Sequence, residues 1–297
     1  MNDARKGSCQ PILEKLASLR VGCMKILSTK DEVQAYYDSK SEDYDEVFDT
    51  LYFRIFDVIT WKYLEPYLPK NSDALILDAG GGTGRWAIKM AKQGCRVVLM
   101  DASEKMLEVA ARRTERQHLQ DKVTIRKGDI TTIGYDDETF DLVLCEHTLF
   151  LFQNPDDPLR EFNRVLKKKA RLIVSVHNHY VAALARLSEN PSSDNVDTAF
   201  KTLTREKHSC MTKGDSVKVY TWTPAEFREM LERNGFHMEK MIGKGMTMPL
   251  RISKDMFMKR KYSKDLYEKL LQFELTMCEK QDALALAGHL QAIAHKL

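Results

Sequence analysis

The chain has 297 residues, of which 43% are hydrophobic and 30% are charged, so it is long enough to bury a full core and its composition is that of an ordinary globular protein. Its formal net charge of +3 is too small to indicate a nucleic-acid or membrane partner by itself. The six cysteines lie far apart without a C-x-x-C pair, which argues against a disulfide framework or a cysteine metal site and for reduced thiols.

The first 70 residues carry helical patterns. Charges interrupt every apolar run near the N-terminus, so this stretch fits neither a secretory signal nor a membrane span, and we expect an amphipathic helix from about Ile12 to Leu19. Residues 30–70 follow with an acidic, tyrosine-rich start. Since no other segment approaches the length of a transmembrane helix, we expect a soluble, cytoplasmic protein.

From residue 74 onward, short apolar runs alternate with helical patterns. Helical spacing follows the runs at 74–79, 96–101 and 140–152, and Ser103 is a good N-cap for the second of these helices. The alternation predicts a parallel sheet with helices on both faces, and in such sheets ligands bind at the carboxyl ends of the strands. Runs typical of strands buried on both faces lie at 74–79, 96–101, 123–129, within 140–152, and at 171–178.

The alternation stops after residue 178. In the later part, TPAEFREMLERNGF predicts a capped helix that ends in glycine, and HMEKMIG predicts a strand. We therefore expect N-terminal helices and a lid (1–70), an α/β core (71–178), a cap insertion of two helices and a strand (179–222), a continuation of the core (223–248), a second helical insertion (249–287) and a final core strand (288–297).

The segment LILDAGGGTGRWA, which begins at residue 75, joins the first strand to the first helix through four glycines. A backbone needs glycine at this density where it turns sharply and lets a ligand approach closely. Arg85 stands where a triphosphate-binding loop has lysine and where a dinucleotide fingerprint has its third glycine, so neither fits. The remaining pattern is G-x-G-x-G at Gly80, Gly82 and Gly84, preceded by Asp78, which favours a smaller, zwitterionic ligand.

With three further motifs, this loop resembles the class I S-adenosylmethionine-dependent methyltransferases, in the small-molecule branch that includes ubiquinone-biosynthesis enzymes. The motifs are VLMDAS and KGDI, which end the second and third strands, and FDLVLCEHTL, which contains the fourth. The resemblance runs from about Tyr36 to Asn178 and resumes from Thr223 to Phe236. It implies a Rossmann-like, seven-stranded, mostly parallel sheet with helical cap insertions, S-adenosylmethionine as methyl donor, S-adenosylhomocysteine as product, and no metal.

The resemblance implies a role for each residue of these motifs. Asp101 would accept hydrogen bonds from both ribose hydroxyls, while Asp129 would face the adenine amino group and the Ile130 amide would meet a ring nitrogen. Met106 would pack on the adenine. The implied cofactor contacts from the core are Asp78, Gly80, Gly82, Gly84, Asp101, Ala102, Met106, Asp129, Ile130 and Glu146. Simpler interpretations stay open, since an aspartate after a strand is often a turn former and Met106 also fits plain helix packing.

The N-terminal segment supplies three more candidates. In related small-molecule enzymes a Tyr-Asp segment closes over the cofactor, so contacts are expected from Tyr37 and Tyr44. Arg54 is expected to pair with the carboxylate of the cofactor's methionine part. Packing of these aromatic residues against the sheet is an equal alternative.

Three histidines follow the ends of predicted strands. His147, just beyond the fourth strand, is the candidate general base for a hydroxyl or thiol acceptor, and His177 and His179, beyond the fifth, come next. A structural or substrate-shaping role is the alternative for each. The sequence does not set the nucleophile, so oxygen, nitrogen, sulfur and carbon acceptors all remain open.

Departures from the family pattern also bear on function. LKKKARL (166–172) lacks the lysine-proline-glycine-glycine turn usual before the fifth strand, at the edge of the sheet opposite the active site. Cys145 to Thr148 stand where enzymes that methylate amino groups of nucleic acids have N-P-P-Y or D-P-P-Y, which argues against a nucleic-acid acceptor. Six methionines between residues 238 and 258 fit either an apolar substrate pocket or the packing of a cap.

We therefore expect a methyltransferase that modifies a small molecule in a capped pocket, without a membrane partner. An RNA- or protein-directed methyltransferase is the alternative within the same chemistry, and it would need a continuous basic groove beside the glycine loop. A non-catalytic protein that keeps the fold for binding is the alternative of another class. The sequence does not set the oligomeric state.

Overall fold

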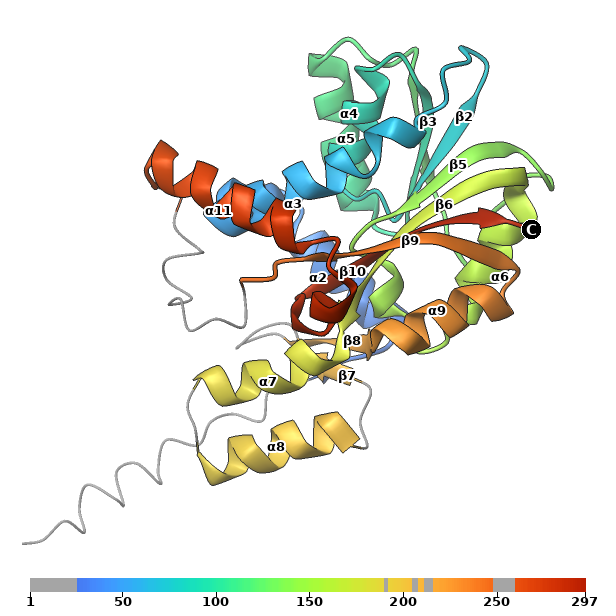
Figure 1. The fold of residues 1–297 in the computed structure, drawn as a ribbon. Coiled ribbons are helices and arrows are strands. Elements are labelled where there is room, and N and C mark those ends of the chain that lie inside the picture. Colours follow the sequence, from blue (N-terminus) through green and yellow to red (C-terminus); the bar gives the residue numbers. More distant parts are fainter. Residues whose placement is uncertain (1–25, 190–191, 205–207, 211–215, 248–259) are drawn as a thin grey trace, which may run out of the picture.

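The computed structural model describes residues 26–189, 192–204, 208–210, 216–247 and 260–297. A seven-stranded sheet forms its centre, in the order β4 (Val123–Lys127), β3 (Arg96–Asp101), β2 (Leu75–Ala79), β5 (Phe140–Cys145), β6 (Leu166–Asn178), β10 (His289–Lys296) and β9 (Phe236–Lys244) (Figure 1). β10 runs antiparallel to both of its neighbours, and the other pairs are parallel. The predicted α/β fold with a seven-stranded, mostly parallel sheet is confirmed.

Helices cover both faces of this sheet, because alternate residues of a strand point to opposite sides. Ile76, Leu99 and Leu142 pack with α3 (Leu51–Lys62), α4 (Arg85–Ala91), α5 (Glu104–Arg116) and α11 (Lys264–Met277) on one face. Leu77, Val98 and Val143 pack with α6 (Asp156–Val165) and α9 (Pro224–Arg233) on the other. The continuous apolar runs in the sequence reflect these two buried faces.

The helix ends follow the signals in the sequence. Ser103 caps α5 by accepting a hydrogen bond from the Met106 amide. Thr223 and Glu226 form a reciprocal capping box at the start of α9. Gly94 and Gly235 follow α4 and α9 with φ of 90° and 79°, the left-handed conformation that favours glycine.

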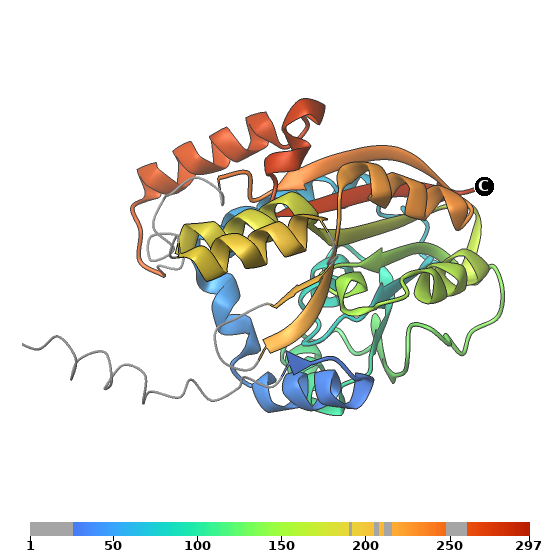
Figure 2. The same cartoon turned by 90° about the horizontal axis from the view of Figure 1, so that it is seen from below.

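Three shorter strands extend the sheet from the carboxyl end of β6. β8 (Ser216–Trp222) pairs with the last two residues of β6, while β1 (Ile26–Leu27) and β7 (His208–Cys210) pair with β8. The cap insertion was expected to hold one strand; its described part has the β7–β8 hairpin, with α7 (His179–Glu189) and α8 (Ser193–Thr204) side by side (Figure 2).

The N-terminal and late segments complete the described chain. Residues 30–70 form α2 (Lys30–Lys40), η1 (Tyr44–Asp49), α3 and η2 (Glu65–Tyr67). A short turn, η3 (Leu149–Leu151), follows β5, and η4 (Gln281–Leu286) precedes β10. The amphipathic helix expected near residues 12–19 lies outside the described residues. No helix within the described ranges is long and apolar enough to cross a membrane.

The LKKKARL segment belongs to β6 and interrupts its pairing with β5. Phe140 pairs with Leu166 and Leu142 pairs with Arg171, so β6 carries extra residues between these two pairs. Lys169, in this bulge, has a φ of 60°, which is costly for a residue with a Cβ. The LKKKARL segment thus forms a bulge in which a lysine adopts a glycine-like conformation.

Replacing Lys169 with glycine should therefore stabilise the protein. We expect Lys169→Gly to raise the free energy of unfolding by roughly 0.5–1 kcal/mol, because relief of a left-handed lysine exceeds the extra chain entropy of glycine. Urea denaturation measures the change. The neighbouring exposed Lys168, whose φ is not positive, is the matched control, and Lys168→Gly should lower stability. Equal losses in both variants would contradict the strain at Lys169.

Candidate active site

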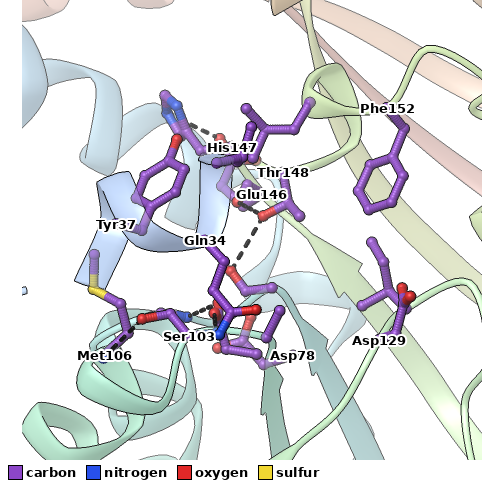
Figure 3. A pocket seen from close by; sticks show the side chains of 18 of the residues that line it. Gln34, Tyr37, Asp78, Ser103, Met106, Asp129, Glu146, His147, Thr148 and Phe152 are labelled. Carbon is purple, nitrogen blue, oxygen red and sulfur yellow. Dashed lines mark hydrogen bonds and ion pairs between the residues drawn. The ribbon is translucent and has the colours of Figure 1, made fainter. Parts of the chain in front are cut away.

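A cavity of about 400 Å³ opens at the carboxyl ends of β2, β3, β4 and β5. β2 lies between β3 and β5, where the strand order reverses, the position at which open α/β sheets bind ligands. Figure 3 shows side chains from α2 and from the strand ends gathered around this cavity. The predicted residues that line it are Tyr37, Tyr44, Asp78, Gly80, Gly82, Asp101, Ala102, Met106, Asp129, Ile130, Glu146 and His147.

The glycine loop forms the floor of the cavity. Gly80 has a φ of 73°, and a Cβ at this position would lie 2.4 Å from the Thr148 side chain, so only glycine lets the two segments meet. Gly84 does not line the cavity. It precedes α4 with a φ of 81°, and a Cβ there would lie 3.0 Å from Leu99 Cδ1, so Gly84 serves the packing of α4 on the sheet.

Asp78 is a buried acid in the cavity wall, with only 1% of its surface exposed. Its carboxylate accepts a hydrogen bond from the Ala87 amide at 3.0 Å. Burial raises the pKa of Asp78 to about 7, and the negative charges of Asp101 and Glu146 act in the same direction. The wall therefore concentrates carboxylates that repel one another.

Asp101 ends β3 and accepts hydrogen bonds from two backbone amides, those of Gly82 at 2.9 Å and Ser103 at 2.8 Å. Burial raises its pKa above the usual range, while these hydrogen bonds oppose the shift. Within the described part of the chain, neither Asp101 nor Asp78 forms an ion pair. Met106 is both buried and part of the lining, so its position agrees with packing in the core and leaves a ligand contact as a prediction.

Asp129 lies at the outer end of the cavity. It accepts a hydrogen bond from the Thr131 amide at 2.9 Å and pairs with the Lys30 ammonium at 2.5 Å. Burial would raise the pKa of Asp129, but these hydrogen bonds hold it below the usual value. Ile130, beside it, is buried. The Lys30 contact from α2 was not predicted.

The segment from α2 to η1 covers the cavity without burying a hydrophobic face of its own, since no residue of α2 is buried. Polar contacts attach it, since Asp38 accepts a hydrogen bond from Ser103 Oγ and Asp45 accepts one from Thr83 Oγ1 at 2.8 Å. The Phe48 ring of η1 also packs against the rings of Phe53 and His147. Tyr37 lines the cavity, with a pKa raised well above 10 by burial. Because α2 has no buried residue, it is held less firmly than an element packed on the core.

The structure does not bring Arg54 to the cavity. The phase of α3 turns its side chain outward, 55% exposed, where its guanidinium pairs with Asp49 at 3.0 Å. The guanidinium that lines the cavity belongs to Arg85, which pairs with Asp57 and lies over the Phe48 ring, 3.4 Å from its centroid. Arg54 is therefore too far outward for the predicted carboxylate contact, and Arg85 was missed.

His147 lies at the inner end of the cavity in an unusual backbone conformation. Its φ of 58° is rare for a residue with a Cβ, and its amide donates to Ser175 Oγ at 3.2 Å. Its Nε2 is buried without a hydrogen-bond partner in the described residues and lies 3.5 Å from Glu146 Oε1. Burial lowers the pKa of His147 well below 6.5, with Lys244 next in effect, so the imidazole is neutral.

The other two candidate histidines do not line the cavity. His177 lies behind His147, with its Nε2 3.3 Å from His289 Nε2, and burial lowers its pKa to about 4. His179 bonds to Thr221 Oγ1 at 2.9 Å in the cap region. Among the described residues, no three His, Cys, Asp or Glu side chains converge in an arrangement that would hold a metal ion.

The remaining unpredicted residue is Lys244, at the end of β9. Its ammonium lies 2.6 Å from Glu146 Oε1 and both side chains are fully buried. A lysine that ends a predicted buried strand was the one available signal in the sequence. Its partner lies 98 positions earlier in the chain, which no local pattern connects.

Comparisons with known proteins match this chain to methyltransferases. Residues 70–235 match the family model described as a methyltransferase domain. A demethylmenaquinone methyltransferase of Lactiplantibacillus plantarum is 36% identical over 105 residues, which cover 34% of this chain and 44% of that relative. A tRNA 5-carboxymethoxyuridine methyltransferase of Escherichia coli is 25% identical over 84% of this chain and 91% of its own length.

A solved structure shows the same fold. The putative S-adenosylmethionine-dependent methyltransferase of Listeria monocytogenes superposes with a TM-score of 0.55 at 22% identity, over 80% of this chain and 96% of that one. The matches to the demethylmenaquinone methyltransferases cover only 44 to 66% of the length of those relatives.

The buried Asp78 gives a pH-dependent stability. Because its folded pKa of about 7 exceeds its unfolded value, its contribution is fully present below about pH 4 and is lost as the pH rises through 7. We expect Asp78→Asn to raise the free energy of unfolding at pH 8 by roughly 2–4 kcal/mol and to have little effect at pH 4. Urea denaturation at both pH values measures this. A variant less stable than the wild type at pH 8 would contradict the burial of an ionised Asp78.

Proposed function

The chain belongs to the class I S-adenosylmethionine-dependent methyltransferases, and on this premise we propose that it transfers a methyl group to a small molecule held at the inner end of the cavity. The observation that carries the proposal is a pair of carboxylates, the buried Asp78 and the half-buried Asp101, which face the cavity without an ion-pair partner among the described residues. A ligand with positive charge relieves both the desolvation and the mutual repulsion of these acids.

S-adenosylmethionine fits this requirement, because it has a sulfonium and an ammonium group and supplies an electrophilic methyl. In the proposed arrangement Asp129, Ile130 and Met106 hold the adenine, and Asp101 binds the ribose hydroxyls. Each carboxylate oxygen of Asp101 accepts a hydrogen bond from one backbone amide, so each has a further lone pair for a ribose hydroxyl. The close approach at Gly80 supports this fit, since a Cβ there would intrude on the segment that carries Thr148.

The methionine part has its partners around the inner half of the cavity. Asp78 and Glu146 offer carboxylates to its ammonium. Arg85, in place of the predicted Arg54, pairs with its carboxylate. Tyr37 and Tyr44, from α2 and η1, close this side as neutral phenols, since burial raises the pKa of Tyr44 to about 12. Exclusion of water and alignment of the reacting atoms are what methyl transfer asks of the protein.

His147 is the proposed general base. It lines the inner end of the cavity, its imidazole is neutral, and its Nε2 is free of hydrogen bonds in the described structure. These are the properties that acceptance of a proton from a hydroxyl or thiol acceptor needs. The strained φ of 58° supports a functional role, because such a cost is retained where the geometry is required.

A small-molecule acceptor is favoured over RNA by the charges at the mouth of the cavity. An RNA-directed enzyme needs cations that are free to bind phosphates. Five basic side chains on α2, α5 and β4 are instead engaged by acids: Lys30 with Asp129, Lys105 with Glu108, Arg112 with Glu42, Arg113 with Asp45, and Lys127 with Glu104. The relatives include enzymes named for a menaquinone and for a tRNA, so RNA stays the alternative.

Loss of Asp101 should remove most of the affinity for the cofactor product. We expect Asp101→Ala to weaken S-adenosylhomocysteine binding roughly 100-fold or more, because two charge-assisted hydrogen bonds from the ribose disappear. Isothermal titration calorimetry measures the change. Asp121→Ala, at an exposed acid outside the cavity, is the matched control and should bind like the wild type. No binding by the wild type, or equal binding by Asp101→Ala, would contradict the assignment of Asp101 as a cofactor ligand.

Total tRNA should bind weakly to the same protein. We expect a dissociation constant above about 10 μM at physiological salt, since the cations at the mouth are already paired. Filter binding across a salt series measures it, on a sample shown to bind S-adenosylhomocysteine. Tight binding with a steep salt dependence would favour the RNA-directed alternative.

A further inference from the structure

A fully buried lysine stands directly behind the wall of the cavity. Lys244 ends β9, and its ammonium bonds to Glu146 Oε1 at 2.6 Å and to Thr60 Oγ1 at 3.0 Å, with 0% of the side chain exposed. It also lies 4.0 Å from the centroid of the Phe56 ring. Lys244 does not line the cavity, whereas Glu146 does. The lysine therefore acts on a bound ligand through Glu146.

Sheet pairing fixes Lys244 in this position. Lys244 pairs with His289 on β10, and His289 pairs with His177 on β6, so the three side chains form a row across the sheet. The His289 ring centroid lies 5.0 Å from that of His147 and 4.2 Å from that of His177. A lysine, a carboxylate and three imidazoles thus share one buried cluster at the inner end of the cavity.

Stability alone gives a weak reason for this ion pair. Desolvation of two charges costs about as much as their attraction returns, and apolar residues of similar size often serve as well or better. A charge pair retained in the dry interior, one side chain away from the cavity, is better explained by what it does for the neighbouring groups.

The distances show which neighbour is affected. Glu146 Oε1 lies 2.6 Å from the Lys244 ammonium and 3.5 Å from His147 Nε2, so the lysine holds the carboxylate that would otherwise pair with a protonated His147. Among the described residues, the other charged or titratable groups that act on His147 are Arg85 from α4, His177 from β6 and His289 from β10, and these three are not anions. The ring is otherwise enclosed by aromatic side chains from α3, η1 and η3, namely Phe48, Phe53, Phe56 and Phe150.

We propose that Lys244 is a positioning residue that engages Glu146 and so keeps His147 unprotonated and its Nε2 open to the acceptor. The inference rests on the proposed function, in which His147 is the base. In the reaction, the acceptor atom bonds to the methyl carbon while the carbon–sulfur bond breaks with its electron pair on sulfur. The acceptor's proton passes to His147 Nε2, and the positive charge lost from the sulfonium appears on the imidazole.

Glu146 then has a second role. The new imidazolium lies 3.5 Å from a carboxylate already neutralised by Lys244, so it is tolerated without being held as a permanent ion pair. Without Lys244, Glu146 and His147 become a buried acid–base pair that shares a proton between turnovers. His147 would then start the reaction in a form that accepts no proton.

Histidine NMR tests this without knowledge of the acceptor. Imidazole ¹H–¹⁵N spectra of selectively labelled protein are recorded from pH 5.5 to 8.5, and His147→Gln identifies the His147 signals. The wild type should keep His147 neutral throughout this range. In Lys244→Met, whose side chain fills a similar volume, the Glu146–His147 pair should take up one proton, and the titration of His147 should rise by at least about one pH unit.

The charge-balanced double variant Lys244→Met/Glu146→Gln is the control. It removes both charges, should fold even where the single variant does not, and should return His147 to the neutral form. Signals of histidines remote from the pair serve as an internal reference. Identical His147 titrations in the wild type and Lys244→Met, protonated His147 in the double variant, or protonation of wild-type His147 at pH 6.5 would each overturn the inference.

Calorimetry on the same samples separates the two proposals. A wild-type sample that binds S-adenosylhomocysteine, together with an unshifted His147 titration in Lys244→Met, would overturn the role of Lys244 and leave the proposed function standing. Failure of the wild type to bind S-adenosylhomocysteine would overturn the proposed function itself, whatever the histidine spectra show.

Discussion

The placement of two acids in the cavity wall, the buried Asp78 and the half-buried Asp101, is the constraint on which the rest of the site depends. Carboxylates that are withdrawn from water need hydrogen-bond donors, and here backbone amides supply them: Ala87 for Asp78, and Gly82 with Ser103 for Asp101. The glycine loop and the start of α4 exist in this form because they must turn amides toward these two acids. Backbone amides carry no full charge, so the cavity remains electrostatically suited to a cation.

At each end of the cavity, a lysine neutralises one of the acids. At the outer end Lys30 neutralises Asp129 on a covering helix that has no buried residues, so this contact belongs to an element that can move away. At the inner end Lys244 neutralises Glu146 from within the sheet, where nothing moves easily. One acid is thus paired from the covering helix and the other from the core. Asp78 and Asp101 lie between these two acids, and a cationic ligand would neutralise them.

Local patterns in the sequence predicted the fold and most of the acids and glycines that line the cavity, because both depend on short segments. Buried strands appear as apolar runs, and each cavity acid follows directly after one. Arg54 was misplaced because its phase on α3 was not considered: the neighbouring Ile55 and Phe56 are buried, which turns Arg54 outward. Lys244 and His289 escaped detection because their importance arises from pairing between β6, β9 and β10, which joins residues about 45 to 125 positions apart.

The central claim, that an acid kept partly protonated by burial becomes the counter-charge of a cationic ligand, can be tested by counting protons. Calorimetric titration of S-adenosylmethionine at pH 7, repeated in buffers of different ionisation enthalpy, gives the number of protons released on binding. With a pKa of about 7 in the free protein, Asp78 is about half protonated at this pH. The account predicts release of about half a proton by the wild type and a correspondingly smaller release by Asp78→Asn. Equal proton counts for the two proteins would contradict it.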